Sequence, residues 1–77
     1  MIYCELLQKK ESSAVYRFGG LITDMTGEIE FYCNEEPAVI MEPSIYHVPK
    51  MWIYKLYWKY KNDLSNGTFK EKMAYEC

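Results

Sequence analysis

The sequence predicts a single α+β domain over residues 1–77, with a three- or four-stranded antiparallel meander packed against one long C-terminal helix. Three observations support this prediction. Short segments with alternating apolar and polar side chains follow one another between Ile2 and Glu42, which is the pattern of half-buried strands. The breaks between them are too short for the crossovers that parallel strands need. From Pro49 onward, apolar side chains instead recur every three to four positions, as they do on a helix.

The first two predicted strands form a hairpin. One runs from Ile2 to Lys10 and the other from Ala14 to Phe18, with a polar break between them. The inward-facing side chains of the pair are Ile2, Cys4, Leu6, Ala14, Tyr16 and Phe18. Gly19-Gly20 ends the second strand, because glycine adopts backbone angles that other residues resist. Residues 21–25 leave two alternatives open: a continuation of this strand after a glycine bulge, or a loop whose apolar residues tuck underneath.

The segment Asp24-Met25-Thr26-Gly27 has turn chemistry, with Asp first and Gly fourth. The next strand, from Glu28 to Cys33, shows the clearest alternation in the chain. Ala38 to Glu42 is predicted to be a short edge strand. Pro37 precedes this strand and Pro43 follows it. Proline suits an edge strand because it has no N–H to donate to the hydrogen bonds of a neighbouring strand.

The helix is predicted to begin with Pro49 at its first position and to run to about Ser65, with Asn66-Gly67 as its C-terminal cap. Its core-facing stripe comprises Trp52, Ile53, Leu56, Tyr57, Tyr60 and Leu64. Residues 68–77 carry two competing patterns. A capping box at Thr68–Glu71 predicts a short helix, whereas alternation from Met73 onward predicts a strand. The two are nearly balanced, and we favour the short helix.

A second apolar stripe on the same helix predicts an interface. Met51, Tyr54 and Trp58 are neighbours at helical spacing and lie between two borders of lysines. Those borders are Lys50, Lys55, Lys59 and Lys61. A helix that covers one sheet needs only one apolar stripe, so we expect the second to contact another copy of the chain. The alternative is half-exposed aromatic rings covered by lysine stems.

The composition and the order of the charges limit the classes of partner that the protein is expected to bind. The formal net charge is −2, which argues against nucleic acid and anionic lipid as partners. The charges are segregated: an acidic segment that includes Asp24, Glu28, Glu30, Glu35, Glu36 and Glu42 precedes the lysine-rich helix. This order predicts pairing between the two segments, within one chain or across a dimer. Without a long apolar run at the N-terminus or elsewhere, we expect a cytoplasmic protein that does not span a membrane.

Residues able to support catalysis or metal binding are scattered. His47 is the single histidine and has no nucleophile near it in sequence. The three cysteines, Cys4, Cys33 and Cys77, lack the short paired spacing of structural zinc sites, so no metal or cofactor is expected. Glu28 and Glu30 share a strand face, but a chain of this size has little room for a glycosidase cleft, and a solvated face is expected.

Three fragments together resemble a group of small uncharacterised bacterial proteins. They are Tyr16-Arg17-Phe18-Gly19, Gly27-Glu28-Ile29-Glu30-Phe31 and the stretch from Phe69 to Glu76 that follows the lysine- and aromatic-rich helix. In such proteins a β-rich half precedes a helix. The resemblance implies a bacterial protein and supplies no functional residues.

The sequence therefore predicts a non-enzymatic protein–protein interaction module that forms a homodimer through Met51, Tyr54 and Trp58. Three alternatives stay open. One is nucleic-acid binding through the four lysines, since rings interleaved with positive charge stack on bases and track phosphates. Another is a role as an inhibitor of, or an immunity protein against, another bacterial protein. The third is a small enzyme or thiol-dependent protein that uses His47 or a cysteine.

Overall fold

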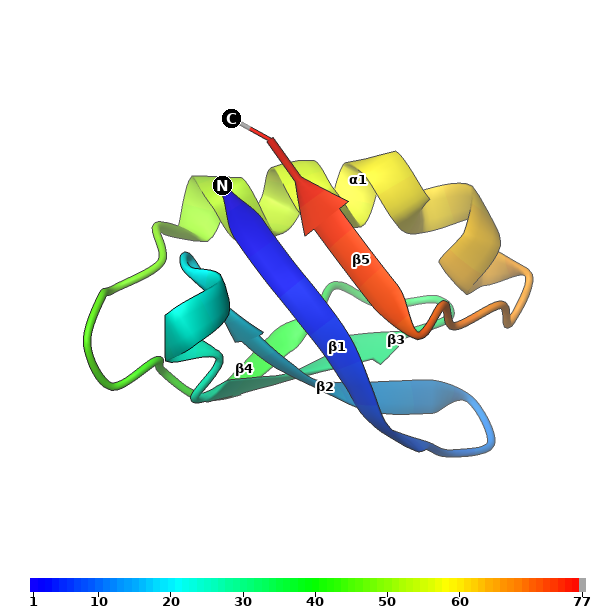
Figure 1. Ribbon diagram of the computed structural model, residues 1–77. Coiled ribbons are helices and arrows are strands. Elements are labelled where there is room, and N and C mark those ends of the chain that lie inside the picture. Colours follow the sequence, from blue (N-terminus) through cyan, green and yellow to red (C-terminus); the bar gives the residue numbers. More distant parts are fainter. Residues whose placement is uncertain (77) are drawn as a thin grey trace.

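The sheet is an antiparallel meander that the end of the chain extends by one strand. The computed structural model describes residues 1–76 and contains five strands within them. The meander consists of β1 (Ile2–Lys9), β2 (Ser13–Gly19), β3 (Gly27–Tyr32) and β4 (Ala38–Met41). The last strand, β5 (Lys72–Tyr75), pairs with the other side of β1 and gives the order β4-β3-β2-β1-β5 (Figure 1). The predicted α+β class and meander are confirmed. The predicted number of strands is wrong, because the tail adds a fifth.

Strand β5 takes the place of the short helix that the capping box favours. The N–H of Leu6 donates to the carbonyl oxygen of Glu71 at 2.7 Å, so backbone pairing begins inside the predicted helical turn. Met73 of β5 is buried and lies opposite Cys4, so it continues the inner face of β1. Alternation prevails over the capping box because the open edge of β1 satisfies the backbone groups of the tail and buries an apolar side chain. Cys77 lies outside the described residues.

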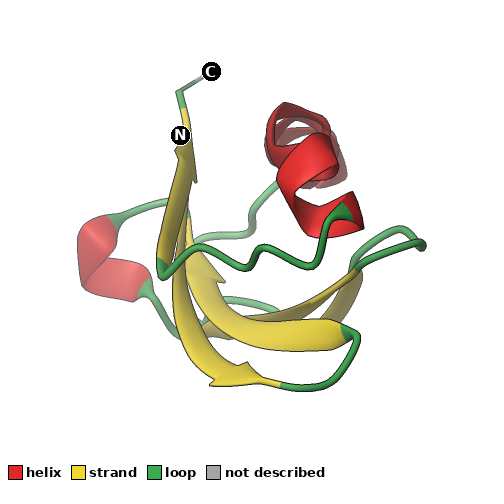
Figure 2. Cartoon of the chain, turned by 90° about the vertical axis from the view of Figure 1, so that its right-hand side faces the viewer, coloured by secondary structure: helices red, strands yellow, loops and turns green. Residues whose placement is uncertain are grey.

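The helix α1 (Lys50–Ser65) lies on one side of the curved sheet, where β1 and β5 stand next to it (Figure 2). It buries Ile53, Leu56, Tyr57 and Leu64 and partly buries Trp52 and Tyr60, so the predicted core stripe is confirmed. Pro49 is the N-cap rather than the first helical residue. The predicted C-terminal cap is also confirmed: Asn66 ends the helix, and Gly67 follows with φ of +77°.

The core is formed where the inner faces of the strands meet the helix. Alternate residues point inward along β3 and at the start of β1, as the alternation predicts. A bulge between Leu6 and Gln8 interrupts the pattern in β1, and β2 is buried on both faces except at Arg17. At its centre the rings of Tyr16 and Phe31 meet edge to face, with centroids 5.4 Å apart and planes at 89°. The hydroxyl of Tyr16 donates to the carbonyl oxygen of Lys70 at 2.6 Å, which ties the segment before β5 to the middle of the sheet.

A short 3₁₀ helix, η1 (Ile22–Asp24), connects β2 to β3. The expected continuation of the strand through residues 21–25 is wrong. The loop alternative holds in part, because Met25 is partly buried whereas Leu21 and Ile22 are exposed. The buried side chain is instead Asp24. Gly19 is required for close approach, because an added methyl group would overlap the carbonyl oxygen of Asp24. Its φ is not positive, so the predicted reason for a glycine there is wrong.

The Asp24 carboxylate holds the loop between β4 and α1. It accepts hydrogen bonds from the hydroxyl of Thr26 at 2.8 Å and from the N–H groups of Ile45 and Tyr46 at 3.2 and 2.9 Å. These bonds, that from Tyr46 most of all, lower the pKa of Asp24 despite its burial. The carboxylate therefore fixes the path by which the chain reaches the start of α1.

Candidate interaction surface

Three side chains on the exposed side of α1 form the surface that the sequence predicts as an interface. Met51 and Trp58 are 54% and 58% exposed, and Tyr54 is partly buried. The rings of Tyr54 and Trp58 stack, with centroids 6.1 Å apart and planes at 21°. We call these three residues the outer helix cluster. They lie outside the core, and together they present an apolar and aromatic face to solvent.

The outer helix cluster adjoins the loop between β3 and β4. The hydroxyl of Tyr54 donates to Oε2 of Glu36 at 3.1 Å. This hydrogen bond, followed by the negative charge of Glu36, raises the pKa of the Tyr54 phenol. The bond fixes the outer edge of the aromatic pair and places an acidic side chain directly beside it.

The four lysines around the cluster do not have equal roles. The amine of Lys59 donates to the carbonyl oxygen of Ala74 at 3.0 Å and lies 5.2 Å from the centroid of the Tyr60 ring. Lys50, Lys55 and Lys61 are exposed. Within residues 1–76, none of the four forms an ion pair with a carboxylate. The predicted pairing of acidic segment and basic helix is therefore not formed inside the described chain, and pairing between copies stays a prediction.

A groove of about 450 Å³ separates β4 from the first half of α1. Its apolar wall includes Val39, Val48 and Ile53, and its polar rim includes Glu42, His47, Lys50 and Tyr54. The imidazole Nδ1 of His47 lies 3.4 Å from a carboxylate oxygen of Glu42. We call this feature the β4 groove. It is continuous with the outer helix cluster, because Tyr54 belongs to both.

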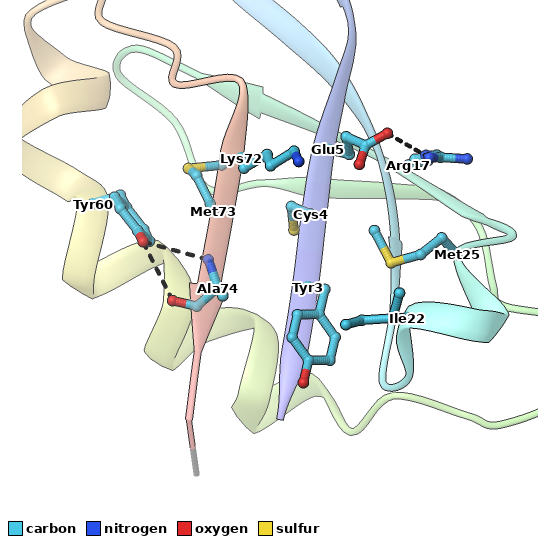
Figure 3. Close-up of a pocket in the computed structure, with 10 residues that line it drawn as sticks. All are labelled: Tyr3, Cys4, Glu5, Arg17, Ile22, Met25, Tyr60, Lys72, Met73 and Ala74. Atoms are coloured by element: carbon cyan, nitrogen blue, oxygen red, sulfur yellow. Dashed lines mark hydrogen bonds and ion pairs between the residues drawn. The ribbon is translucent and has the colours of Figure 1, made fainter.

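The two edges of the sheet are treated differently. At β5, the hydroxyl of Tyr60 accepts from the N–H of Ala74 at 3.4 Å and donates to its carbonyl oxygen at 3.3 Å (Figure 3). The amine of Lys59 donates to the same carbonyl oxygen. Side chains of α1 thus bind the outward backbone groups of Ala74 in that strand. At β4, all four residues are exposed, and none of them is charged. Proteins protect edge strands with charge, a covering segment, short length, proline or a bulge. β4 is short, lies between Pro37 and Pro43 and carries a bulge in its pairing with β3, but among the described residues it has no charge and no covering segment on its outward edge.

A second, smaller groove of about 380 Å³ lies along β1 and β5 near η1 (Figure 3). Tyr3, Ile22 and Met25 line its apolar end, and Glu5, Arg17 and Lys72 line its polar end. The guanidinium of Arg17 forms an ion pair with the Glu5 carboxylate. Of the two positively charged side chains named here, Lys72 is the one without an ion pair in the described part of the chain. The one thiol in the lining of the groove, that of Cys4, is buried.

The remaining candidates for chemistry lie apart. Burial raises the pKa of the Cys4 thiol to about 12, which suppresses its reactive thiolate form. Glu30 accepts from the hydroxyl of Ser13 at 2.6 Å and pairs with Lys10 at 3.3 Å, so it serves the sheet rather than a carboxylate pair with Glu28. Among residues 1–76, no three metal-ligating side chains come together, and Cys77 is outside that range. Nor does any helix there have the length and apolarity to cross a membrane.

Comparison with protein-family models, with curated proteins and with solved structures found no match to this chain. The candidate site is therefore defined by its geometry. Sequence patterns placed the outer helix cluster correctly on an exposed helix face. They did not find the β4 groove, which depends on how far α1 lies from β4. The proline brackets and the uncharged run from Ala38 to Met41 gave a partial signal for an open edge.

Proposed function

We propose that this protein is a protein–protein interaction module that associates with a second copy of itself through the outer helix cluster. The observation that carries the proposal is the stacked Tyr54–Trp58 pair, which lies beside an exposed Met51 outside the core. Large aromatic and methionine side chains are enriched at protein interfaces, where they bury much area with little loss of side-chain freedom. Clustering distinguishes them from the scattered apolar side chains of an ordinary surface.

The size of a stable interface indicates how far this contact must extend. A standard interface buries about 800 Å² on each partner. A fully exposed aromatic side chain presents about 150–250 Å², so the cluster, at the exposures given above, supplies only about 300 Å². The lysine stems and the neighbouring acidic loop that contains Glu35 and Glu36 would supply the rest of the interface.

Charge favours one arrangement of the two copies. If the helices met face to face, the lysines that border each cluster would oppose one another. If α1 of one copy met the acidic loop of the other, opposite charges would meet instead. The two surfaces adjoin through the Tyr54–Glu36 hydrogen bond. A two-fold axis near that bond would therefore bring each helix onto its partner's acidic loop, as a self-complementary interface requires.

Sedimentation equilibrium on the wild type and two variants tests the proposal. The wild type is expected to dimerise at high micromolar concentration. Trp58→Glu should weaken dimerisation about thirtyfold or more, which corresponds to losing a central contact of about 2 kcal/mol. Ile22→Glu is the matched control, because Ile22 is exposed and apolar but lies on η1 and is not part of the outer helix cluster. It should dimerise as the wild type does.

Two results would contradict the proposal. A wild type that stays monomeric throughout the concentration range removes its basis. Equal weakening by Trp58→Glu and Ile22→Glu would show that added charge, rather than the cluster, is responsible. Raising the salt concentration provides a further check, because exposed Lys–Glu pairs between copies should weaken with screening.

A second candidate function is the binding of single-stranded nucleic acid at the same surface. The stacked Tyr54–Trp58 pair with exposed Lys50, Lys55 and Lys61 near it supports this alternative, since bases stack on such rings. The acidic side chain of Glu36 beside the rings opposes it. Binding of a labelled single-stranded oligonucleotide at low salt tests this alternative. If the protein binds nucleic acid, the affinity should fall steeply as the salt concentration rises, and no binding at low salt would reject this function.

A further inference from the structure

The outward edge of β4 has backbone groups available for another strand. In an antiparallel sheet, successive residues point their N–H and C=O groups alternately to the two neighbouring strands. The N–H of Cys33 donates to the carbonyl oxygen of Ser12, so the odd-numbered residues of β3 point to β2 and the even-numbered ones to β4. Glu30 pairs with Ala38, which therefore points back to β3. The alternation turns the N–H and C=O of Val39 away from the sheet. A bulge after Val39 interrupts the alternation, so Val39 is the residue of β4 whose outward groups this argument places.

Three exposed apolar side chains lie along this edge. Val39, Ile40 and Met41 are exposed by 37%, 55% and 50% of their surfaces. The side chain of Val39 lies opposite Ile29 on the inner face, so it borders the β4 groove. A strand added next to β4 would direct every second side chain into the mouth of that groove, toward Val48 and Ile53.

We propose that the β4 edge and the β4 groove bind an extended segment of another protein by strand addition. The segment would be short, because Pro37 and Pro43 limit the accessible edge to the four residues of β4. Its inward side chains would be apolar, to match the wall of the groove. Main-chain hydrogen bonds to Val39 would provide the alignment.

Charge defines the ends of the bound segment and argues against a second copy as the occupant. Glu36 and Glu42 flank β4 on its two sides, and Lys50 and His47 lie on the rim of the groove. If two β4 strands paired antiparallel, Glu36 of one copy would approach Glu42 of the other at both ends. A segment with lysine or arginine at its ends would instead find a carboxylate at each end.

The test uses a labelled synthetic peptide with a Val-Thr-Val-Thr centre and two lysines at each end, measured by fluorescence anisotropy. The protein is the Trp58→Glu variant as well as the wild type, so the result does not depend on self-association. We expect saturable binding to both. A peptide with glutamates in place of the lysines should bind at least about tenfold more weakly, because its ends would oppose Glu36 and Glu42.

Val39→Pro is the decisive variant. It removes the outward N–H without disturbing the pairing of β4 with β3, and proline is tolerated on an edge. It should reduce affinity about tenfold or more, the effect expected from losing the main-chain bonds at that residue. Val39→Thr keeps the N–H and the side-chain size, so it should bind within about threefold of the parent. Circular dichroism confirms that each variant is folded.

Three outcomes would overturn the inference. The first is no binding to folded wild type and Trp58→Glu at millimolar peptide. The second is equal affinity of Val39→Pro and Val39→Thr, which would exclude strand addition. The third comes from amide hydrogen exchange: the Val39 amide should gain protection when the peptide binds, and an unchanged rate would place the peptide elsewhere.

Discussion

The hydrogen bond from Tyr16 to Lys70 provides a sharp test of how the fold is held together. Tyr16 is fully buried, and its hydroxyl reaches the Lys70 carbonyl at 2.6 Å across 54 positions of sequence. Tyr16→Phe keeps the ring and its edge-to-face contact with Phe31 but removes the hydroxyl. The substitution therefore isolates one polar contact between the middle of the sheet and the segment that leads into β5.

The size of the effect follows from what the substitution leaves behind. A buried hydrogen bond contributes about 1 kcal/mol net, and a partner left without a bond adds a desolvation penalty. We expect the free energy of unfolding to fall by about 1.5 kcal/mol. For a domain of this size, that corresponds to a decrease in Tm of about 6–12 °C. The loss should be concentrated at the tail, so amide exchange in β5 should accelerate more than in β3.

Thermal and urea unfolding followed by circular dichroism provide the measurement, with Tyr46→Phe as the control. The phenol ring of Tyr46 is exposed, so this variant should match the wild type. If Tyr16→Phe changes Tm by less than about 2 °C, the bond to Lys70 does not stabilise the fold in the way we describe. Uniform acceleration of exchange in β3 and β5 would likewise show that the tail is not a separate unit.

Three further predictions concern glycine, thiol and carboxyl groups. Gly19→Ala should destabilise the fold by about 3 kcal/mol, because the added methyl group would overlap the carbonyl oxygen of Asp24. Gly20→Ala is the control, since the atom nearest to its methyl group would be 3.6 Å away. In urea unfolding, Gly20→Ala should unfold at nearly the same concentration as the wild type. Alkylation at pH 8 followed by peptide mass spectrometry should label Cys33 well before Cys4, whose pKa of about 12 and burial protect it; equal rates would refute this. Asp24→Asn should melt below the wild type at neutral pH. The native pKa of Asp24 lies below its ordinary value, so this stabilisation is complete above about pH 3.9 and is lost as pH falls through the native pKa. Melts across that range should show the two proteins converging, and a constant difference would refute it.

The periodicity of apolar side chains predicted those elements whose buried face depends only on residues close together in the sequence. The alternation in Glu28–Tyr32 and the stripe that contains Ile53 and Leu56 each report which face is buried, and both are confirmed. The edge position of β4 also followed from its two prolines. These predictions required no knowledge of distant residues.

The errors arose where distant residues decide the outcome. The capping box at Thr68–Glu71 is a local helix signal, but the free side of β1 is an alternative that no local pattern reveals. In the same way, Asp24 reads as a turn residue, and only the fold brings Ile45 and Tyr46 to its carboxylate. The outer helix cluster was predictable because its members are neighbours on one helix. The β4 groove was not, because its two walls come from separate elements.

The pairing of β1 with β5 has a mechanical consequence. Ile2 lies opposite Tyr75, so the beginning and the end of the described chain leave the sheet at the same end of two adjacent antiparallel strands. A force that separates these two ends acts across the β1–β5 ladder rather than along it. Its hydrogen bonds would then break one after another, so β5 should detach at low force while the other four strands still resist. Single-molecule extension through these two ends should accordingly show a small early step before the main rupture.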